Sequence, residues 1–388
     1  MNIEKMISQK VKDVPPSGIR KFFDIANEMG DAISLGVGEP DFDTPWHIRE
    51  EGIYSLEKGK TVYTANAGLL ELRKEICKYM KRRFNVDYSG DKQTLVTVGG
   101  SEGIDIALRT LIVPGDEVLI PEPSYVSYKP CTIFAGGTPI AIPTKEENAF
   151  KLTAEELERY ITPRTKILIL PYPNNPTGAI MEREDLEKIA AVLRDKDIVV
   201  ISDEIYGELT YGKAHVSIAS IEGMYDRTIV LSGFSKTYAM TGWRLGYALG
   251  PEDVISVMTK MHQFTIMCAP TTAQYAAIEA LKNGDEDVVM MRNAYDKRRR
   301  LMVDRFRSMG LSCFEPEGAF YVFPSIQKTG LTSEAFCEQL LKDQKVAVVP
   351  GTAFGDSGEG FIRCSYAYSV DELKEALSRI ETFIHKML

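Results

Sequence analysis

The chain has 388 residues, more than the roughly 250–300 residues at which a single hydrophobic core usually stops growing, so two domains are expected. Its net charge is −9 and its pI is near 5.3, values that disfavour binding to nucleic acid or to an anionic membrane. The cysteines are scattered without a Cys-x-x-Cys pair, and the sequence shows neither a signal-peptide core nor a membrane-length apolar run. We therefore expect a soluble, cytoplasmic protein without a metal site.

The predicted elements change in kind along the chain. Residues 1–45 are rich in Gly, Pro and Asp and predict an N-terminal arm that joins a small domain. From residue 46 to 285, short apolar runs alternate with amphipathic helices, which predicts a large α/β domain with a mostly parallel sheet covered by helices. Residues 286–388 predict a smaller α+β domain that includes a charged helix at 295–309 and a strand at 319–323. The expected strands of the large sheet are 94–98, 117–120, 167–170, 198–201, 228–231 and 246–249. Helices are expected near 69–79, 104–111, 183–194 and 252–261.

A glycine-rich turn follows the first of these strands, at residues 99–103. Small residues at such a turn leave N–H groups free at a helix N-terminus, which makes a cradle for a phosphate. The Glu102 carboxylate would repel a phosphate, so we expect its side chain to point away while its amide binds. The turn lacks both the P-loop lysine and the dinucleotide-binding glycine spacing, and a plain tight turn remains an alternative.

Polar side chains also follow two later strands. Asp203 comes just after the run 198–201, where a carboxylate requires a cation or hydrogen bonds. It either caps a following helix or balances a positive charge on a buried heterocycle. Asn175 lies in the proline-rich turn 171–178. Because ligands bind beyond the carboxyl ends of such strands, its amide is expected to point into the same cleft.

Lys236 follows the strand 228–231 and lies among small and aromatic residues. Most lysines are solvated and have no chemical role. Here Arg244, eight residues further on, would lower the pKa of the amine towards its neutral, nucleophilic form. Together with the segments above, Lys236 completes one predicted site at the carboxyl edge of the sheet.

These segments resemble the class I/II aminotransferases of fold type I, which depend on pyridoxal 5'-phosphate (PLP). The resemblance rests on Asn-Asn-Pro-Thr-Gly at 174–178, Ser-Asp-Glu-Ile-Tyr at 202–206 and Ser-Gly-Phe-Ser-Lys at 232–236, and it extends from residues 34–41 to 361–363. It implies a PLP-binding large domain, a homodimer, and transfer of an amino group through a lysine–PLP aldimine and pyridoxamine phosphate.

The resemblance also implies a role for each matching residue around the cofactor ring. Lys236 would form the Schiff base and later move the proton between the substrate Cα and the cofactor. Asp203 would pair with the protonated pyridine nitrogen, which keeps the ring an electron sink. Asn175 and Tyr206 would hydrogen-bond the phenolic oxygen, and Tyr125 would stack on the ring.

By the same resemblance, the phosphate would be held by the following residues: Gly100, Ser101, Glu102, Ser235 and Arg244. Many relatives carry a serine three residues before the lysine, where this chain has Gly233. Ser232 therefore remains an alternative to Ser235. Tyr63 would reach the phosphate of a neighbouring subunit, which implies shared active sites. Arg363 would bind the substrate α-carboxylate through a two-pronged contact, Gly38 would supply a backbone donor beside it, and Asn175 would also belong to the substrate site.

The sequence is less informative about the substrate. No basic residue occurs at 265–274, and Ser101 stands where some aspartate-specific relatives carry a lysine. Apolar or aromatic walls are available from Ile19, Phe22, Tyr63 and Phe354. The chain most resembles the aromatic or broad-specificity branch, with 2-oxoglutarate as a typical amino acceptor.

Several alternatives stay open. Within fold type I they are an aspartate, alanine or N-acetyl-diaminopimelate aminotransferase and a β-lyase. A nucleotide-binding oxidoreductase lacks its fingerprint, and a binding module without catalysis would leave the retained site residues unexplained. The histidines show no ligand spacing and are predicted to be structural.

Overall fold

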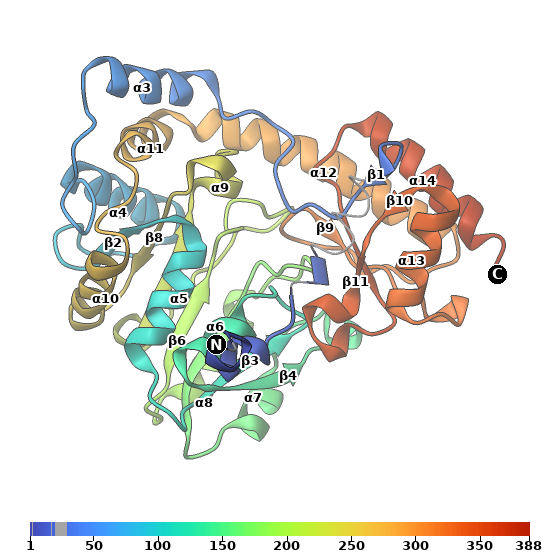
Figure 1. Ribbon diagram of the computed structural model, residues 1–388, viewed down its shortest axis with the longest axis horizontal. Helices are drawn as coiled ribbons and strands as arrows, with labels where there is room; N and C mark the ends of the chain where they lie inside the picture. Colours follow the sequence, from blue (N-terminus) through green and yellow to red (C-terminus); the bar gives the residue numbers. More distant parts are fainter. Residues whose placement is uncertain (2, 17, 20–28) are drawn as a thin grey trace.

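The computed structural model describes residues 1, 3–16, 18–19 and 29–388 (Figure 1). A seven-stranded sheet with the order β2-β8-β7-β6-β5-β3-β4 forms its larger part. Because β8 runs antiparallel to both β2 and β7 and the other neighbours are parallel, β2, β5, β6 and β7 end at the same edge. The strands are β2 (Thr94–Thr97), β3 (Glu117–Glu122), β4 (Thr138–Pro143), β5 (Thr165–Leu170), β6 (Val199–Asp203), β7 (Thr228–Gly233) and β8 (Gly246–Leu249).

Helices cover both faces of this sheet, as the continuous apolar strands require. In β5, Ile167 and Ile169 belong to the core beneath α5 and α10, while Leu168 and Leu170 belong to the core beneath α7 and α8. The helices are α3 (Trp46–Glu57), α4 (Leu70–Phe84), α5 (Gly99–Leu111), α6 (Tyr128–Ala135), α7 (Ala154–Tyr160), α8 (Arg183–Leu193), α9 (Phe234–Thr237), α10 (Glu252–Thr265) and α11 (Thr271–Asn283). The α/β fold class is therefore confirmed.

A second group of elements lies beside the large sheet (Figure 1). In it, β12 pairs antiparallel with β9 and β11, and β1 from the N-terminal part pairs parallel with β10. The elements are β1 (Ile33–Ser34), α12 (Asp285–Ser308), β9 (Tyr321–Val322), α13 (Ser333–Gln344), β10 (Val346–Ala347), β11 (Val349–Pro350), β12 (Ile362–Ser365) and α14 (Val370–Ile384). The domain boundaries at 45/46 and 285/286 stay predictions.

Short helical segments complete the chain. Apart from the α-helical turn α1 (Gln9–Lys12), they are 3-10 helices: η1 (Ile3–Met6), η2 (Glu146–Asn148), η3 (Ile218–Ser220), η4 (Tyr225–Arg227), η5 (Thr241–Trp243), η6 (Gln327–Thr329), η7 (Gly351–Phe354) and η8 (Asp356–Gly358). No helix within the described ranges has the length and apolar character needed to cross a membrane.

The structure differs from the sequence prediction at several elements. The strand β4 was not predicted, because prolines at residues 139 and 143 argue against a central strand; β4 lies at the sheet edge, where proline is tolerated. The helices α3, α6, α7 and α11 were also not predicted. The helix predicted from residue 295 begins at Asp285, where three acidic residues occupy its first turn and stabilise its N-terminus.

Candidate active site

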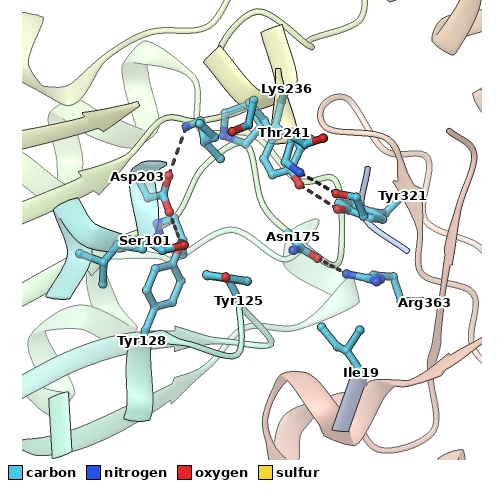
Figure 2. A pocket seen from close by; sticks show the side chains of 18 of the residues that line it. Ile19, Ser101, Tyr125, Tyr128, Asn175, Asp203, Lys236, Thr241, Tyr321 and Arg363 are labelled. Carbon is cyan, nitrogen blue, oxygen red and sulfur yellow. Dashed lines mark hydrogen bonds between the residues drawn. The ribbon is translucent and has the colours of Figure 1, made fainter. Parts of the chain in front are cut away.

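A cavity of about 310 Å³ opens at the carboxyl edge of the sheet, between the turns that follow its strands and the elements around β9 and β12 (Figure 2). Sequence segments far apart meet there, as expected for a parallel sheet. The predicted site residues that line the cavity are Gly38, Gly100, Ser101, Tyr125, Asn175, Asp203, Tyr206, Ser235, Lys236, Arg244 and Arg363.

Lys236 lies in α9, directly after β7, and its amine points into the cavity. The Nζ atom donates a 2.5 Å hydrogen bond to the carbonyl oxygen of Gly38. Burial, together with the charges of Arg363 and Arg244, lowers the pKa of Lys236 to about 8, although the charge of Glu39 opposes this shift. A substantial fraction of this amine is therefore neutral and nucleophilic at mildly alkaline pH.

Asp203 is the last residue of β6, and it is buried in the wall of the cavity. Its Oδ2 accepts a 2.7 Å hydrogen bond from the Tyr128 hydroxyl, and its Oδ1 accepts one of 3.2 Å from the Ile205 N–H. Burial raises the pKa of Asp203, and these hydrogen bonds oppose the rise. The alternative that Asp203 caps a helix is wrong, because a turn follows β6.

Two tyrosine pairs form walls of the cavity. The hydroxyls of Tyr206 and Tyr321 lie 2.8 Å apart, and burial raises the pKa of both phenols, so each keeps its proton. Tyr125 follows β3 and meets Tyr128 edge to face, with ring centroids 5.6 Å apart. Gly38 lies so close to Tyr321 that a Cβ at this position would come within 2.3 Å of the hydroxyl.

Arg363, on β12, is buried with 1% of its surface exposed. Its Nη1 donates a 2.9 Å hydrogen bond to Asn175 Oδ1, and its Nη2 donates to the carbonyl oxygen of Gly36. The guanidinium Cζ lies 4.4 Å from the ring centroid of Tyr321 and 4.8 Å from that of Phe354. Its buried Nε has no hydrogen-bond partner among the described residues. A buried cation with a free donor suits an anionic ligand.

The amino end of α5 forms another part of the cavity, through Gly100 and Ser101. Gly99 has a φ of +75°, and a Cβ there would meet the Arg244 guanidinium at 2.7 Å, so only glycine fits. The Arg244 Nη1 also donates to the Thr241 carbonyl oxygen at 2.9 Å. Cationic and N–H donors thus converge at this end of the cavity.

Similarity to known proteins agrees with this geometry. A sequence model of the family Aminotransferase class I and II matches residues 30–380. The chain belongs to this family. It is 52% identical to the putative aminotransferase YugH of Bacillus subtilis (strain 168), over 98% of both chains. It is 47% identical to the aspartate aminotransferase of Pyrococcus abyssi (strain GE5 / Orsay), again over 98% of both.

A solved structure of the aromatic aminotransferase from Pyrococcus horikoshii OT3 superimposes with a TM-score of 0.90. The two proteins are 46% identical, over 94% of this chain and 99% of the other. This aminotransferase therefore has the fold type I architecture and uses PLP as its cofactor. Residues of the cavity fit PLP: it offers an amine, a buried carboxylate that can balance a ring cation, and N–H and arginine donors for a phosphate.

Two predicted site residues do not line the cavity. Tyr63 is 76% exposed on the surface. Glu102 turns its carboxylate away from the cavity, as described below, while its neighbours on α5 face inward. The Ser232 hydroxyl donates to the Glu204 carbonyl oxygen at 3.3 Å, so Ser235 is the serine that reaches the cavity. Phe22 falls outside the described residues.

Sequence reasoning missed three polar residues that line the cavity: Tyr128, Tyr321 and Thr241. Tyr128 lies three residues after Tyr125, and this spacing offered a weak signal, because residues three apart share a face in a helical turn. Tyr321 lies within the predicted strand 319–323, but nothing in the sequence relates it to Tyr206. Among the described residues, no cluster of three or more metal-ligating side chains occurs.

Proposed function

We propose that this aminotransferase moves the amino group of an aromatic L-amino acid, with broad tolerance for others, to a 2-oxo acid such as 2-oxoglutarate, and that Lys236 is its catalytic residue. The observation that carries the proposal is the amine of Lys236, with a pKa near 8, in one cavity with a buried carboxylate and a buried arginine. When bound, PLP supplies an electron sink for the carbanion at the substrate Cα.

In this proposal, the chain's own residues hold the cofactor and move the proton. Asp203 holds a positive charge at the ring nitrogen, and the Tyr128 hydroxyl keeps the Asp203 carboxylate ionised and oriented. Tyr206 and Asn175 donate to the phenolic oxygen, and Tyr125 covers one ring face. The phosphate is bound by the α5 amino end and the side chains beside it: Gly100, Ser101, Glu102 through its amide, Ser235 and Arg244.

The substrate carboxylate is proposed to bind Arg363. Its unpartnered Nε–H and the remaining N–H groups form a fork that can donate hydrogen bonds to both oxygens of a carboxylate. The rings of Tyr321 and Phe354 fix the plane of that fork. With the carboxylate held there, the substrate Cα is directed towards Lys236, which takes its proton as a general base.

The side-chain preference rests on what surrounds the substrate position. Cations among the described residues that line the cavity are Lys236, Arg244 and Arg363, and all three have roles above. The side-chain carboxylate of a substrate such as aspartate would therefore have no further cation to pair with there. Ile19 and Tyr125 instead provide apolar and aromatic surface. This supports aromatic substrates; the named specificity of the Pyrococcus abyssi relative makes aspartate the second candidate.

A steady-state panel of phenylalanine, tyrosine, aspartate and alanine with 2-oxoglutarate tests this preference. The proposal expects the largest kcat/KM for the two aromatic amino acids. Aspartate or alanine far ahead of both would overturn the aromatic assignment, and release of pyruvate or ammonia without transamination would favour a β-lyase.

The proposal includes a cytoplasmic homodimer with shared active sites. Tyr63 lies outside its own cavity and is exposed, as is the neighbouring Val62. This exposure supports a role of Tyr63 at the phosphate of a second subunit. The described cysteines are all free, which supports a reducing compartment. A monomeric mass in solution at working concentration would contradict the shared site.

A further inference from the structure

The amino end of α5 carries an anion of its own. Glu102 lies in the first turn of this helix, whose N–H groups face the cavity. A helix N-terminus attracts any negative charge, so a carboxylate here competes with a phosphate for the same amides or repels it. The structure must therefore hold this carboxylate off the amides that face the cavity.

Both oxygens of Glu102 are engaged away from the cavity. Oε2 accepts a 2.5 Å hydrogen bond from the Val98 N–H, and Oε1 lies 2.6 Å from His262 Nδ1. The Glu102 side chain is only 9% exposed. The carboxylate is thus fixed on the side of α5 that faces α10, while the adjacent Gly100 and Ser101 face the cavity.

His262 comes from α10, which packs against α5 (Figure 1). Its side chain is fully buried, and its Nε2 has no hydrogen-bond partner among the described residues. In the tautomer with its proton on Nδ1, the Nδ1–H donates to Glu102 and Nε2 is an unprotonated acceptor. In the other tautomer, the Nε2–H would be a buried donor without an acceptor. The contacts thus favour the Nδ1–H tautomer, and Glu102 is the partner that gives this buried imidazole a polar role.

We propose that His262 is a positioning residue for the cofactor phosphate. Together with the Val98 N–H at the N-cap of α5, it holds the Glu102 carboxylate off the amides of Gly100 and Ser101, so that these two amides stay available to the phosphate. This inference rests on the proposed phosphate site. It also assigns a specific role to a histidine that the sequence marks only as structural.

Titration of the apoprotein with PLP, followed by visible absorption, tests the proposal. His262→Leu keeps the apolar volume and removes the donor, and its Kd for PLP is expected to rise about tenfold, the scale of a charge at a helix terminus. His262→Asn keeps an N–H near the position of Nδ1 and is expected to bind PLP within about threefold of the unmodified protein. Inorganic phosphate should raise the Tm of the unmodified apoprotein and of His262→Asn, but not of His262→Leu.

A second pair of variants separates positioning from a merely structural role. In the double variant Glu102→Gln/His262→Leu, the neutral amide no longer repels a phosphate, so PLP affinity should return to within about threefold of Glu102→Gln alone. A structural role of His262 would leave the double variant as weak as His262→Leu. That result, or a Kd for His262→Leu within about twofold of the unmodified protein, overturns the proposal.

Variants of Glu102 keep the test decisive if His262→Leu fails to fold. Glu102→Asp keeps the charge but is too short to reach His262, and should weaken PLP binding about tenfold, whereas Glu102→Gln should not. Equal affinities of the two variants would overturn the proposal. Unmodified protein that binds no PLP would instead overturn the cofactor assignment itself.

Discussion

Replacing Arg363 by alanine removes a buried guanidinium that lies close to the rings of Tyr321 and Phe354 and whose Nε has no partner among the described residues. If the substrate carboxylate binds this fork, the change deletes a charge-assisted, two-pronged contact at a buried side chain of the cavity. Truncating one partner of such a buried charge pair costs about 2–5 kcal/mol. Since about 1.4 kcal/mol corresponds to tenfold, kcat/KM should fall on the order of 30-fold to several thousand-fold.

The decrease in kcat/KM of Arg363→Ala should appear mainly as a higher KM. It should be equal for amino acids and 2-oxo acids, because both carry the same carboxylate. Half-reaction rates measured against substrate concentration, in each direction, give both constants. PLP affinity should not change. Arg363→Lys keeps the charge without the planar fork, so its KM should lie between those of the unmodified protein and Arg363→Ala. Arg292→Ala, a half-buried arginine outside this cavity, is the matched control and should leave KM unchanged. A KM for Arg363→Ala within about threefold of the unmodified value would refute the carboxylate assignment.

Three further predictions concern the cofactor side of the cavity. Lys236→Ala should abolish transamination yet still bind PLP through the phosphate contacts; turnover near the unmodified rate would contradict the assignment. Tyr128→Phe removes the hydrogen bond to Asp203 and should raise the pKa of that carboxyl further, lowering kcat/KM about tenfold or more, as for a charge-assisted hydrogen bond. Unchanged kinetics of this variant would rule out that role. Because the pKa of Lys236 is lowered to about 8, the rate of PLP capture by the apoprotein should rise about tenfold per pH unit below pH 8 and level off above it. A rate of PLP capture that continues to rise up to pH 10 would show that the pKa of Lys236 is not lowered.

Much of the large sheet and most of the cavity could be predicted from the sequence, for a definite physical reason. Parallel strands buried on both faces read as continuous apolar runs, and the polar residues directly after them must meet at one edge. Asp203, Lys236 and Asn175 are all of this kind, and the structure brings them together. The edge strand β4 was not predicted, because the two prolines within it argue against a paired strand in the sequence pattern.

Contacts between distant segments could not be predicted from periodicity. Tyr128 reaches Asp203 across 75 residues, Tyr206 reaches Tyr321 across 115, and His262 reaches Glu102 across 160. Such pairs depend on how helices and loops pack over the sheet, and a local pattern of apolar and polar residues carries no record of that packing.

The surroundings of Arg363 also could not be predicted from the sequence. The sequence predicted a carboxylate-binding arginine by resemblance, but only the packed structure shows its ring contacts and its unpartnered Nε. These features depend on how β9 and η7 fold against β12: Tyr321 lies 42 residues before Arg363 (363 − 321) and Phe354 nine residues before it (363 − 354), and neither spacing predicts a contact.

An absorption spectrum of the purified protein, taken after incubation with PLP, shows whether Lys236 and PLP carry out transamination in this cavity. We expect a visible band that disappears when phenylalanine is added and returns when 2-oxoglutarate follows, with no such cycle in Lys236→Ala. A protein that shows no visible band with PLP, or a band that no amino acid changes, would contradict this expectation.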